Sequence, residues 1–234
     1  MKNLDVVILC GGKGKRLQAF IKDRPKPMAE INGRPFLDIL FDYVSGYGAK
    51  RIILCAGYMA DVIRSYYRNK NLTFELVISE EKVPLGTGGA IRDSQGLVKT
   101  SSLLVMNGDC FCPINLNNFV GFHEHNKALL SIAVTETDNP ADYGSILLDK
   151  DNKIIRFGEK DNSAKSLINT GMYLFKKDVL SLIPNKTPCS LEYDFFPNLV
   201  GKDFYGFIIQ EPFIDIGTPE RFKQAQGLLG KLRK

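Results

Sequence analysis

A glycine-rich and basic segment, residues 11–17 (GGKGKRL), directly follows the first apolar run of the chain, residues 4–10 (LDVVILC). Glycines after a buried strand let the backbone approach a ligand closely, and their N–H groups can cradle phosphate oxygens. The segment is not a P-loop, because no Gly-Lys-Ser/Thr ends it. It also lacks the third glycine and the acidic partner of a dinucleotide fingerprint. It predicts another kind of phosphate site, and a turn that binds nothing is the alternative.

A lysine held between two prolines comes next, in residues 24–28 (RPKPM). Proline fixes its own φ and restricts the residue before it, so Lys26 is carried by a stiff segment. A cation held in this way suits a phosphate group, and a solvated loop lysine is the alternative.

Acidic residues lie at or near the ends of two further apolar runs. Asn107, Gly108 and Asp109 end one run, and Asp215 lies in another. Open α/β sheets build their ligand crevice at strand ends, and two carboxylates brought together there would bind Mg²⁺ along with phosphate oxygens. A helix cap is the alternative for Asp215. Residues 80–90 (EEKVPLGTGGA) place glycines where a helix should begin, which suits an anion or a closely packed base.

The elements that must position these residues alternate between strand-like and helix-like patterns. In the first half, we expect strands at 4–10, 51–55, 73–79 and 102–106, and helices at 36–46, 60–68 and 89–98. This alternation predicts a parallel sheet covered by helices on both faces. After about residue 130, short strands at 130–135, 145–148, 153–157, 172–175, 205–209 and 213–216 should complete a mixed sheet. Because no repeat or linker interrupts the chain, we expect a single domain over 1–234.

The composition is that of an ordinary globular protein, with 44% hydrophobic and 24% charged residues among 234. We expect neither a signal peptide nor a membrane helix, because no apolar stretch approaches the roughly 20 residues that a bilayer requires. The net charge of +5 favours anionic ligands, but the basic residues are scattered, which argues against nucleic acid as a partner. Five cysteines are an odd count for a disulfide framework, so we expect free thiols in a cytoplasmic protein.

Three further features are expected to be structural. His123 and His125 are two residues apart, which points them in different directions on a helix, so a solvated helix end is favoured over a zinc site. Cys110 and Cys112 are interpreted as small packing residues, with a catalytic thiolate as the alternative. The tyrosine pair at 66–67 is interpreted as the core and rim of a helix.

Taken together, these motifs resemble the sugar-phosphate nucleotidyltransferase family, the nucleoside-diphosphate-sugar pyrophosphorylases, along essentially the whole chain. The matching segments stand in the family's order: 11–17 (Gly-Gly-x-Gly-x-Arg-Leu), 25–27 (PKP), 85–90 (LGTGGA), 107–109 (NGD), 143–144 (YG), 159–160 (EK), 169–171 (NTG) and 215–218 (DIGT). The resemblance implies a Rossmann-like three-layer αβα nucleotidyltransferase fold with a central mixed, mainly parallel sheet. It implies transfer of a nucleoside monophosphate to a sugar 1-phosphate with Mg²⁺, and release of pyrophosphate.

The resemblance also implies roles, residue by residue. It assigns Arg16 and Lys26 to catalysis, and Asp109 and Asp215 to Mg²⁺. In a nucleotide-binding half, about 1–130, the other expected contacts are Leu9, Gly11, Gly12, Gly14, Lys15, Glu80, Glu81, Pro84, Gly86, Thr87, Asn107 and Gly108. In a sugar-phosphate-binding half, about 131–234, they are Tyr143, Gly144, Glu159, Lys160 and Asn169.

The expected nucleotide is GTP. Guanine N1–H and N2–H₂ are adjacent donors that one carboxylate can accept, whereas uracil and thymine suit an amide that both donates and accepts. Glu80 and Glu81 precede the loop where the resemblance places the base, and Glu81 is slightly favoured as the reader. Within the family, overall similarity favours the D-glycero-α-D-manno-heptose 1-phosphate guanylyltransferase branch, which serves bacterial surface polysaccharides. The alternatives are a mannose or glucose 1-phosphate acceptor with GTP, UTP, CTP or dTTP, and a non-catalytic nucleotide-sugar-binding module. A homodimer is also left open.

Overall fold

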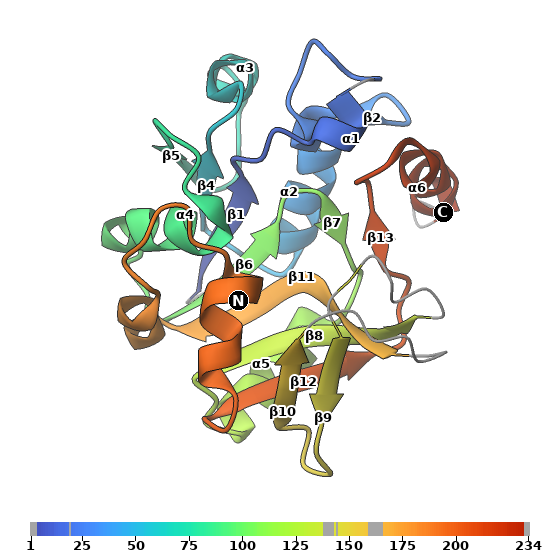
Figure 1. Ribbon diagram of the computed structural model, residues 1–234. Coiled ribbons are helices and arrows are strands. Elements are labelled where there is room, and N and C mark those ends of the chain that lie inside the picture. The colour runs from blue at the N-terminus through green and yellow to red at the C-terminus, as the bar shows by residue number, and fades with distance from the viewer. Residues whose placement is uncertain (1–3, 19, 138–142, 144, 159–165, 232–234) are drawn as a thin grey trace.

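The first apolar run forms β1 (Asp5–Cys10), the strand around which the parallel part of the sheet is built (Figure 1). It pairs in parallel with β4 (Arg51–Ala56) on one side and with β6 (Ser102–Asn107) on the other, and β5 (Glu75–Glu80) lies beyond β4. Apolar side chains are buried on both faces of β1, because helices cover both. The expected parallel first half is therefore confirmed. The computed structural model describes residues 4–18, 20–137, 143, 145–158 and 166–231.

Strands from the second half extend the same sheet. The long strand β11 (Ser166–Lys176) runs antiparallel to β6 and also pairs with β8 (Leu130–Thr137) and β9 (Ser145–Leu148). Next to these, β10 (Ile154–Gly158) pairs with β9, and β12 (Phe204–Ile209) runs parallel to β8. The described residues thus form a mixed nine-stranded sheet, whose main path is β10-β9-β11-β6-β1-β4-β5. β11 begins before the expected strand at 172–175, because its first residues pair with β8 and β9.

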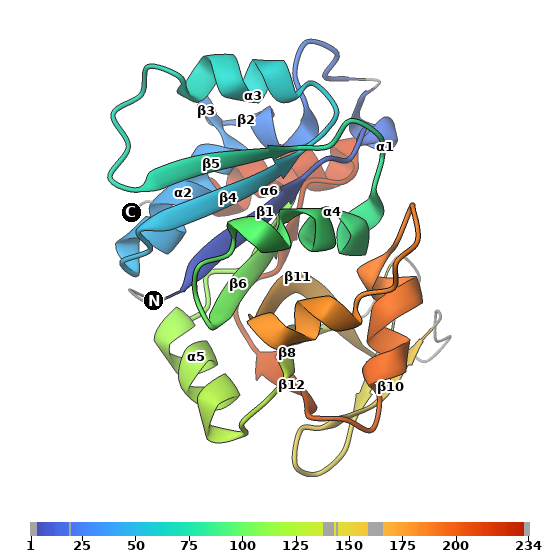
Figure 2. The same cartoon turned by 90° about the vertical axis from the view of Figure 1, so that its left-hand side faces the viewer.

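Helices cover both faces of the sheet, which gives three layers (Figure 2). One core contains Val6 and Ile8 of β1 and residues of α2 (Phe36–Gly46), α3 (Ala60–Tyr67), α5 (Leu116–His125) and α6 (Pro219–Lys231). The other contains Val7 and residues of α4 (Gly86–Ser94) and of the short segments η4 (Lys177–Leu182), η5 (Leu191–Phe195) and η6 (Phe196–Leu199). The expected three-layer α/β class is confirmed. Over the described ranges, the helices are too short or too polar to cross a bilayer.

Several elements depart from the expectation. The strand expected at 213–216 does not join the mixed sheet, because β13 (Ile214–Asp215) pairs with β7 (Cys110–Phe111) in a separate two-stranded ribbon. α4 starts and ends earlier than the helix expected at 89–98, and a 3₁₀ turn, η2 (Gln95–Leu97), follows it. The helix end expected at His123 and His125 is the end of α5, whereas α6 and the hairpin of β2 (Glu30–Ile31) and β3 (Arg34–Pro35) have no counterpart among the expected elements.

His123 corrects the expectation of a solvated helix end. Its imidazole is buried on α5, where Nδ1 lies 2.9 Å from the Ser131 hydroxyl oxygen. Burial, with a smaller contribution from Lys176, lowers the pKa of the imidazole to about 4, so the ring is neutral near pH 7. The cysteines agree with the expectation: all five are free thiols, and burial raises the pKa of Cys10 and Cys110. The tyrosines at 66–67 divide between a buried and an exposed ring, also as expected.

Candidate active site

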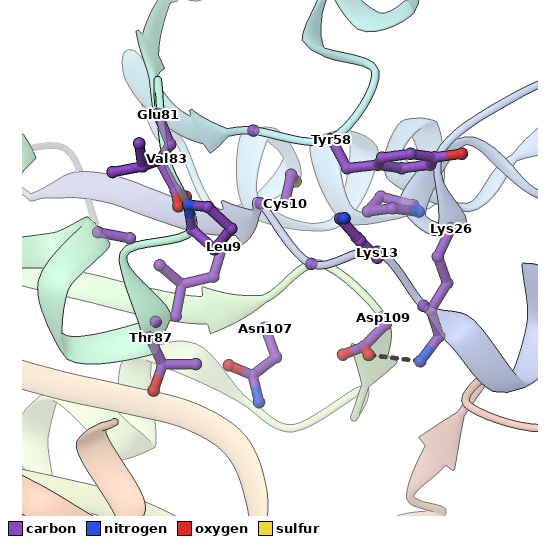
Figure 3. A pocket seen from close by; sticks show the side chains of 18 of the residues that line it. Leu9, Cys10, Lys13, Lys26, Tyr58, Glu81, Val83, Thr87, Asn107 and Asp109 are labelled. Carbon is purple, nitrogen blue, oxygen red and sulfur yellow. Dashed lines mark hydrogen bonds and ion pairs between the residues drawn. The ribbon is translucent and has the colours of Figure 1, made fainter. Parts of the chain in front are cut away.

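The carboxyl ends of the parallel strands border a cavity of about 820 Å³ (Figure 3). A volume of this size suits a small-molecule ligand, and open α/β sheets bind ligands at this edge. Its walls are the loop after β1, the turn around Lys26, the loops after β4 and β5, and the end of β6. The lining residues are Leu9, Cys10, Gly11, Gly12, Lys13, Gly14, Lys26, Pro27, Gly57, Tyr58, Glu81, Lys82, Val83, Pro84, Gly86, Thr87, Ala90, Asn107 and Asp109.

The glycine loop at 11–14 joins β1 to the short helix α1 (Lys15–Gln18). Gly14 has a φ of +58°, a conformation that favours glycine, and a Cβ there would lie 3.0 Å from the Cβ of Lys26. Gly12 faces open space, since no atom would lie within 4 Å of a Cβ at that position. The loop therefore packs against Lys26 on one side and is accessible to a ligand on the other.

Lys26 begins a 3₁₀ turn, η1 (Lys26–Met28), between the buried side chains of Pro25 and Pro27. Its own side chain is only 11% exposed, and its Nζ donates to Asp109 Oδ2 at 2.5 Å. Burial alone would raise the pKa of the Asp109 carboxyl, but the charge and hydrogen bond of Lys26 outweigh it and lower that pKa below its usual value. The expected phosphate lysine and an expected metal ligand are therefore direct partners.

Asp215 lies near Asp109 because β13 pairs with β7. The Ile216 N–H donates to the Asp109 carbonyl oxygen at 3.0 Å. A Cβ on Gly217 would lie 2.7 Å from Asp215 Oδ1 and 3.3 Å from Lys26 Nζ, so both groups border the same glycine. The described residues contain no cluster of three or more side chains that could hold a metal ion. Two carboxylates are enough for Mg²⁺, because this ion completes its shell with phosphate and water oxygens.

The two glutamates at the end of β5 point in different directions: Glu80 is its last residue and Glu81 follows it. Glu81 lines the cavity, where its Oε2 accepts the Leu85 N–H at 3.2 Å (Figure 3). Its carboxylate lies over Gly11, so that a Cβ on this glycine would overlap it. Burial raises the pKa of the Glu81 carboxyl above its usual value. Glu80 pairs instead with Arg64 on α3, so of the two expected base readers Glu81 is the one that faces the cavity.

Two of the glycines at the start of α4 serve packing, which argues against the anion and leaves the closely packed base of the expectation for this helix start. The N–H groups of Gly88 and Gly89 both donate to the Cys189 carbonyl oxygen, at 2.9 and 3.1 Å, so they are not available to a ligand. Gly86 has a φ of +76°, and a Cβ there would lie 2.5 Å from the same oxygen. Glycine is required because the backbone around Cys189 passes directly against the start of the helix.

We expect Gly86→Ala to destabilise the protein by about 2–4 kcal/mol, because alanine there needs a left-handed backbone and collides with the Cys189 carbonyl group. Gly96→Ala is the matched control. A Cβ on Gly96 would have nothing within 4 Å, so its effect should stay within about 0.5 kcal/mol. Chemical denaturation measures both values. Equal midpoints for Gly86→Ala and the wild type would show that the start of the helix can adapt.

Asn107 projects from the end of β6 and lies between Thr87 and Asp109 in the view of Figure 3. Its Oδ1 is buried and has no hydrogen-bond partner within the described part of the chain. Its Nδ2 would lie 2.6 Å from a Cβ on Gly171, which has a φ of +76°. A buried acceptor without a partner in a cavity wall can receive a hydrogen bond from a ligand.

Two of the residues expected on the sugar side are tied to other parts of the site. Asn169 Nδ2 donates to the Tyr173 hydroxyl oxygen at 2.8 Å. The Tyr143 hydroxyl donates to Asp215 Oδ2 at 3.1 Å, and the guanidinium of Arg221 on α6 donates to the same oxygen at 2.8 Å. Burial, followed by the charge of Asp215, raises the pKa of the Tyr143 hydroxyl, which keeps it a donor.

Two further expected residues that the structure describes, Arg16 and Gly108, do not line the cavity. Arg16 is exposed on α1. Gly108 is buried, and a Cβ on it would lie 2.8 Å from Cys10 Sγ, so it serves close packing. Outside the described residues lie Gly144, Glu159, Lys160 and the Lys15 side chain.

Sequence reasoning passed over Lys13, Tyr58, Lys82 and Arg221. Lys13 lies within the segment assigned to phosphate, and Tyr58 and Lys82 follow the ends of β4 and β5. The rule that strand ends border the crevice could have found all three. Arg221 reaches Asp215 from α6, an element that the pattern did not indicate.

The glycine loop, the Lys26–Asp109 pair, Asp215 and Glu81 therefore come together at one edge of an α/β sheet. A sequence model described as nucleotidyl transferase matches residues 5–231. The chain belongs to the nucleotidyl transferase family. The resemblance inferred from the ordered motifs is thereby confirmed.

Two similar proteins match this chain over nearly the full length of both partners in the comparison. A D-glycero-alpha-D-manno-heptose 1-phosphate guanylyltransferase from Campylobacter jejuni is 36% identical over 94% of this chain and 97% of its own. A protein of the same name from Aneurinibacillus thermoaerophilus is 34% identical over 95% of this chain and 97% of its own. A mannose-1-phosphate guanylyltransferase from Mycobacterium tuberculosis is 31% identical over 94% of this chain but only 62% of its own.

Solved structures share the fold of this nucleotidyl transferase. HddC from Yersinia pseudotuberculosis aligns with a TM-score of 0.86 and 35% identity, over 97% of this chain and 99% of HddC. HddC complexed with GMP-PN aligns with a TM-score of 0.84 over the same shares. The inositol-1-phosphate CTP transferase from T. maritima, 18% identical with a TM-score of 0.81 over 100% of this chain and 98% of its own, shows likeness of fold alone.

Proposed function

We propose that the protein transfers GMP from GTP to a sugar 1-phosphate and releases pyrophosphate. The observation that carries this proposal is the match, over nearly the full length of both chains, to two heptose 1-phosphate guanylyltransferases. The cavity supports it with a glycine loop suited to phosphates, a nearly buried lysine, and a carboxylate on the opposite wall.

The transfer needs no general base, because the sugar phosphate is already an oxyanion. One of its oxygens attacks the α-phosphorus of GTP, the bond from that phosphorus to the α,β-bridging oxygen breaks, and pyrophosphate leaves with the electron pair. The barrier is the repulsion between the anions and the charge that grows on pyrophosphate. In this proposal, Lys26 neutralises the attacked phosphate and the incoming one. The amides of 11–14 and the side chain of Arg16 hold the departing charge.

We propose Asp109 and Asp215 as the ligands of Mg²⁺. When bound, the ion would neutralise triphosphate charge and align the reacting groups. Lys26 already pairs its cation with Asp109, and its ammonium and Asp215 Oδ1 both border Gly217, which supports the assignment. Lys26 would then exchange its contact with Asp109 for phosphate oxygens.

The proposed acceptor is D-glycero-α-D-manno-heptose 1-phosphate, contacted by Tyr143, Gly144, Glu159, Lys160 and Asn169. Mannose 1-phosphate is the second candidate, because a mannose-1-phosphate guanylyltransferase is 31% identical over 94% of this chain. Pyrophosphate release from GTP, UTP, CTP and dTTP, each with heptose, mannose and glucose 1-phosphates, tests both. Heptose with GTP should give the highest kcat/KM. Turnover with mannose 1-phosphate alone would select the second candidate, and release from no pair would indicate a binding module.

Glu81 should decide the preference for GTP over UTP. A carboxylate can accept both guanine donors, and a base without them leaves the carboxylate unpaired, so the wild type should discriminate by a few kcal/mol. Glu81→Gln should lower the ratio of kcat/KM for GTP to that for UTP at least about tenfold, the value of a hydrogen bond to a charged group.

Glu80→Gln is the matched control for this change. Glu80 is the neighbouring residue with the same side chain, but it pairs with Arg64 and does not line the cavity, so its variant should keep the wild-type ratio. Equal use of GTP and UTP by the wild type, or an unchanged ratio in Glu81→Gln, would remove Glu81 from base recognition.

We also propose that the protein works in the cytoplasm, where GTP is available and free thiols such as its five cysteines stay reduced. A homodimer stays a prediction.

A further inference from the structure

Arg221 contacts two expected site residues at once, although it lies in neither of the sequence motifs that contain them. It stands in the first turn of α6, where its backbone N–H donates to the Thr218 hydroxyl oxygen at 3.3 Å. Its Nη1 donates to Asp215 Oδ2 at 2.8 Å. Its guanidinium carbon lies 4.9 Å from the centre of the Tyr143 ring, at cation–π distance. Arg221 thus joins an expected metal ligand to an expected sugar contact.

The hydrogen bonds give the two oxygens of Asp215 different surroundings. Oδ2 accepts from both Arg221 and the Tyr143 hydroxyl, whereas Oδ1 accepts from the Gly217 N–H. Oδ1 also borders Gly217 together with the Lys26 ammonium, since a Cβ on Gly217 would lie 2.7 Å from Oδ1 and 3.3 Å from Lys26 Nζ. The donors at Oδ2 therefore hold the carboxylate with Oδ1 on the side of Gly217, which the ammonium also borders.

Burial strengthens this arrangement. The side chains of Arg221 and Asp215 are 20% and 10% exposed. Phe213 packs edge-on against Tyr143, with 5.7 Å between the ring centres. Away from water, a charge-assisted hydrogen bond is strong and holds a carboxylate in one orientation. A planar guanidinium can stack on a ring and bind a carboxylate at the same time, which an ammonium cannot reproduce.

From these contacts, and resting on the proposed function, we propose that Arg221 is a positioning residue for the transfer reaction. It fixes Asp215 with Oδ1 towards the metal, and it holds Tyr143 against the same carboxylate. Groups that orient metal ligands in this way typically change metal affinity by 10- to 100-fold when they are removed. Because Tyr143 lies on the sugar side, loss of Arg221 should also raise KM for the sugar phosphate more than KM for GTP.

The test measures metal binding without turnover. Mn²⁺ is titrated in the presence of GTP, and the concentration that gives half of the maximal enhancement of water-proton relaxation is determined. Arg221→Gln should raise this concentration at least about tenfold. The Mg²⁺ concentration for half-maximal activity should rise in parallel. Lys223→Gln, an exposed position on the same helix, is the matched control and should change neither value. Arg221→Lys keeps the charge without the planar fork and should fall between the wild type and Arg221→Gln.

Tyr143→Phe gives a second, milder probe, because it keeps the ring and removes only the hydroxyl that Asp215 accepts. It should shift the metal dependence in the same direction, and it carries the test if Arg221→Gln does not fold. If folded Arg221→Gln shows the metal dependence of the wild type, the proposal is overturned. If Arg221→Gln does not fold, the same result for Tyr143→Phe overturns it. Lower stability with unchanged metal dependence also overturns it, since Arg221 would then be merely structural. Failure of the proposed function looks different: the wild type would bind Mn²⁺ and GTP but release no pyrophosphate with any sugar phosphate.

Discussion

Asp109→Asn and Asp215→Asn should each lower kcat at least about a hundredfold, which corresponds to about 2.7 kcal/mol of transition-state stabilisation. The ribbon of β7 and β13 brings Asp215 near Asp109, the partner of Lys26, and carboxylate oxygens are the ligands that a hard divalent cation prefers. Asparagine has the same shape but no charge, so the affinity for the metal should fall without loss of the fold. Steady-state kinetics at several Mg²⁺ concentrations measure both effects.

Asp203→Asn is the control for these substitutions, because Asp203 is an exposed carboxylate paired with Lys153 at 3.6 Å. It should keep the wild-type kcat. EDTA should abolish the activity of the wild type, and added Mg²⁺ should restore it. Full turnover in EDTA, or normal kcat in both site variants, would take the metal out of the mechanism.

Lys26→Ala should lower kcat by at least two orders of magnitude, roughly the loss of one preorganised electrostatic partner. The side chain is nearly buried, lies between two buried prolines and is already bonded to a carboxylate, so its cation is held in place before a ligand arrives. A cation positioned in this way costs little reorganisation when charge develops on the transferred phosphate. The loss should therefore appear mainly in kcat and less in KM for GTP.

Lys22→Ala removes an exposed lysine from the same segment and should leave kcat unchanged. Because Lys26 and Asp109 are direct partners, Lys26→Ala and Asp109→Asn should be non-additive in thermal stability, with a coupling of about 0.5–3 kcal/mol. A normal kcat for Lys26→Ala would show that Lys26 takes no part in catalysis, as the alternative of a solvated loop lysine predicts. Additive stability effects would mean that the two groups do not interact in solution.

The parallel half of the fold was predictable because its strands are covered on both faces. Continuous apolar runs such as β1 are distinctive in a sequence, and the helices between them carry a clear apolar spacing. The rule that ligands bind at strand ends then placed Asp109 at the crevice, whereas the family resemblance placed Glu81 near the base, and both line the cavity.

The contacts made over long sequence distances were not predictable from local patterns. Asp215 meets Asp109 through a two-residue ribbon, which is too short to give a periodic signal. Gly88 and Gly89 looked like an anion site, but their N–H groups are taken by Cys189, about a hundred residues away. The same reason applies to Arg221, whose role depends on where α6 begins relative to Asp215. These features depend on tertiary packing, which cannot be inferred from the local patterns of a single sequence.

The most direct test of the proposed guanylyl transfer is a phosphorus-31 NMR time course of the wild type with GTP, Mg²⁺ and D-glycero-α-D-manno-heptose 1-phosphate. The three GTP signals should give way to the two coupled signals of a sugar-linked diphosphate and the single signal of pyrophosphate, in equal amounts of product. Asp109→Asn should leave the spectrum unchanged over the same time. Persistence of GTP with each of the heptose, mannose and glucose 1-phosphates, or its conversion to GDP and inorganic phosphate, would contradict guanylyl transfer.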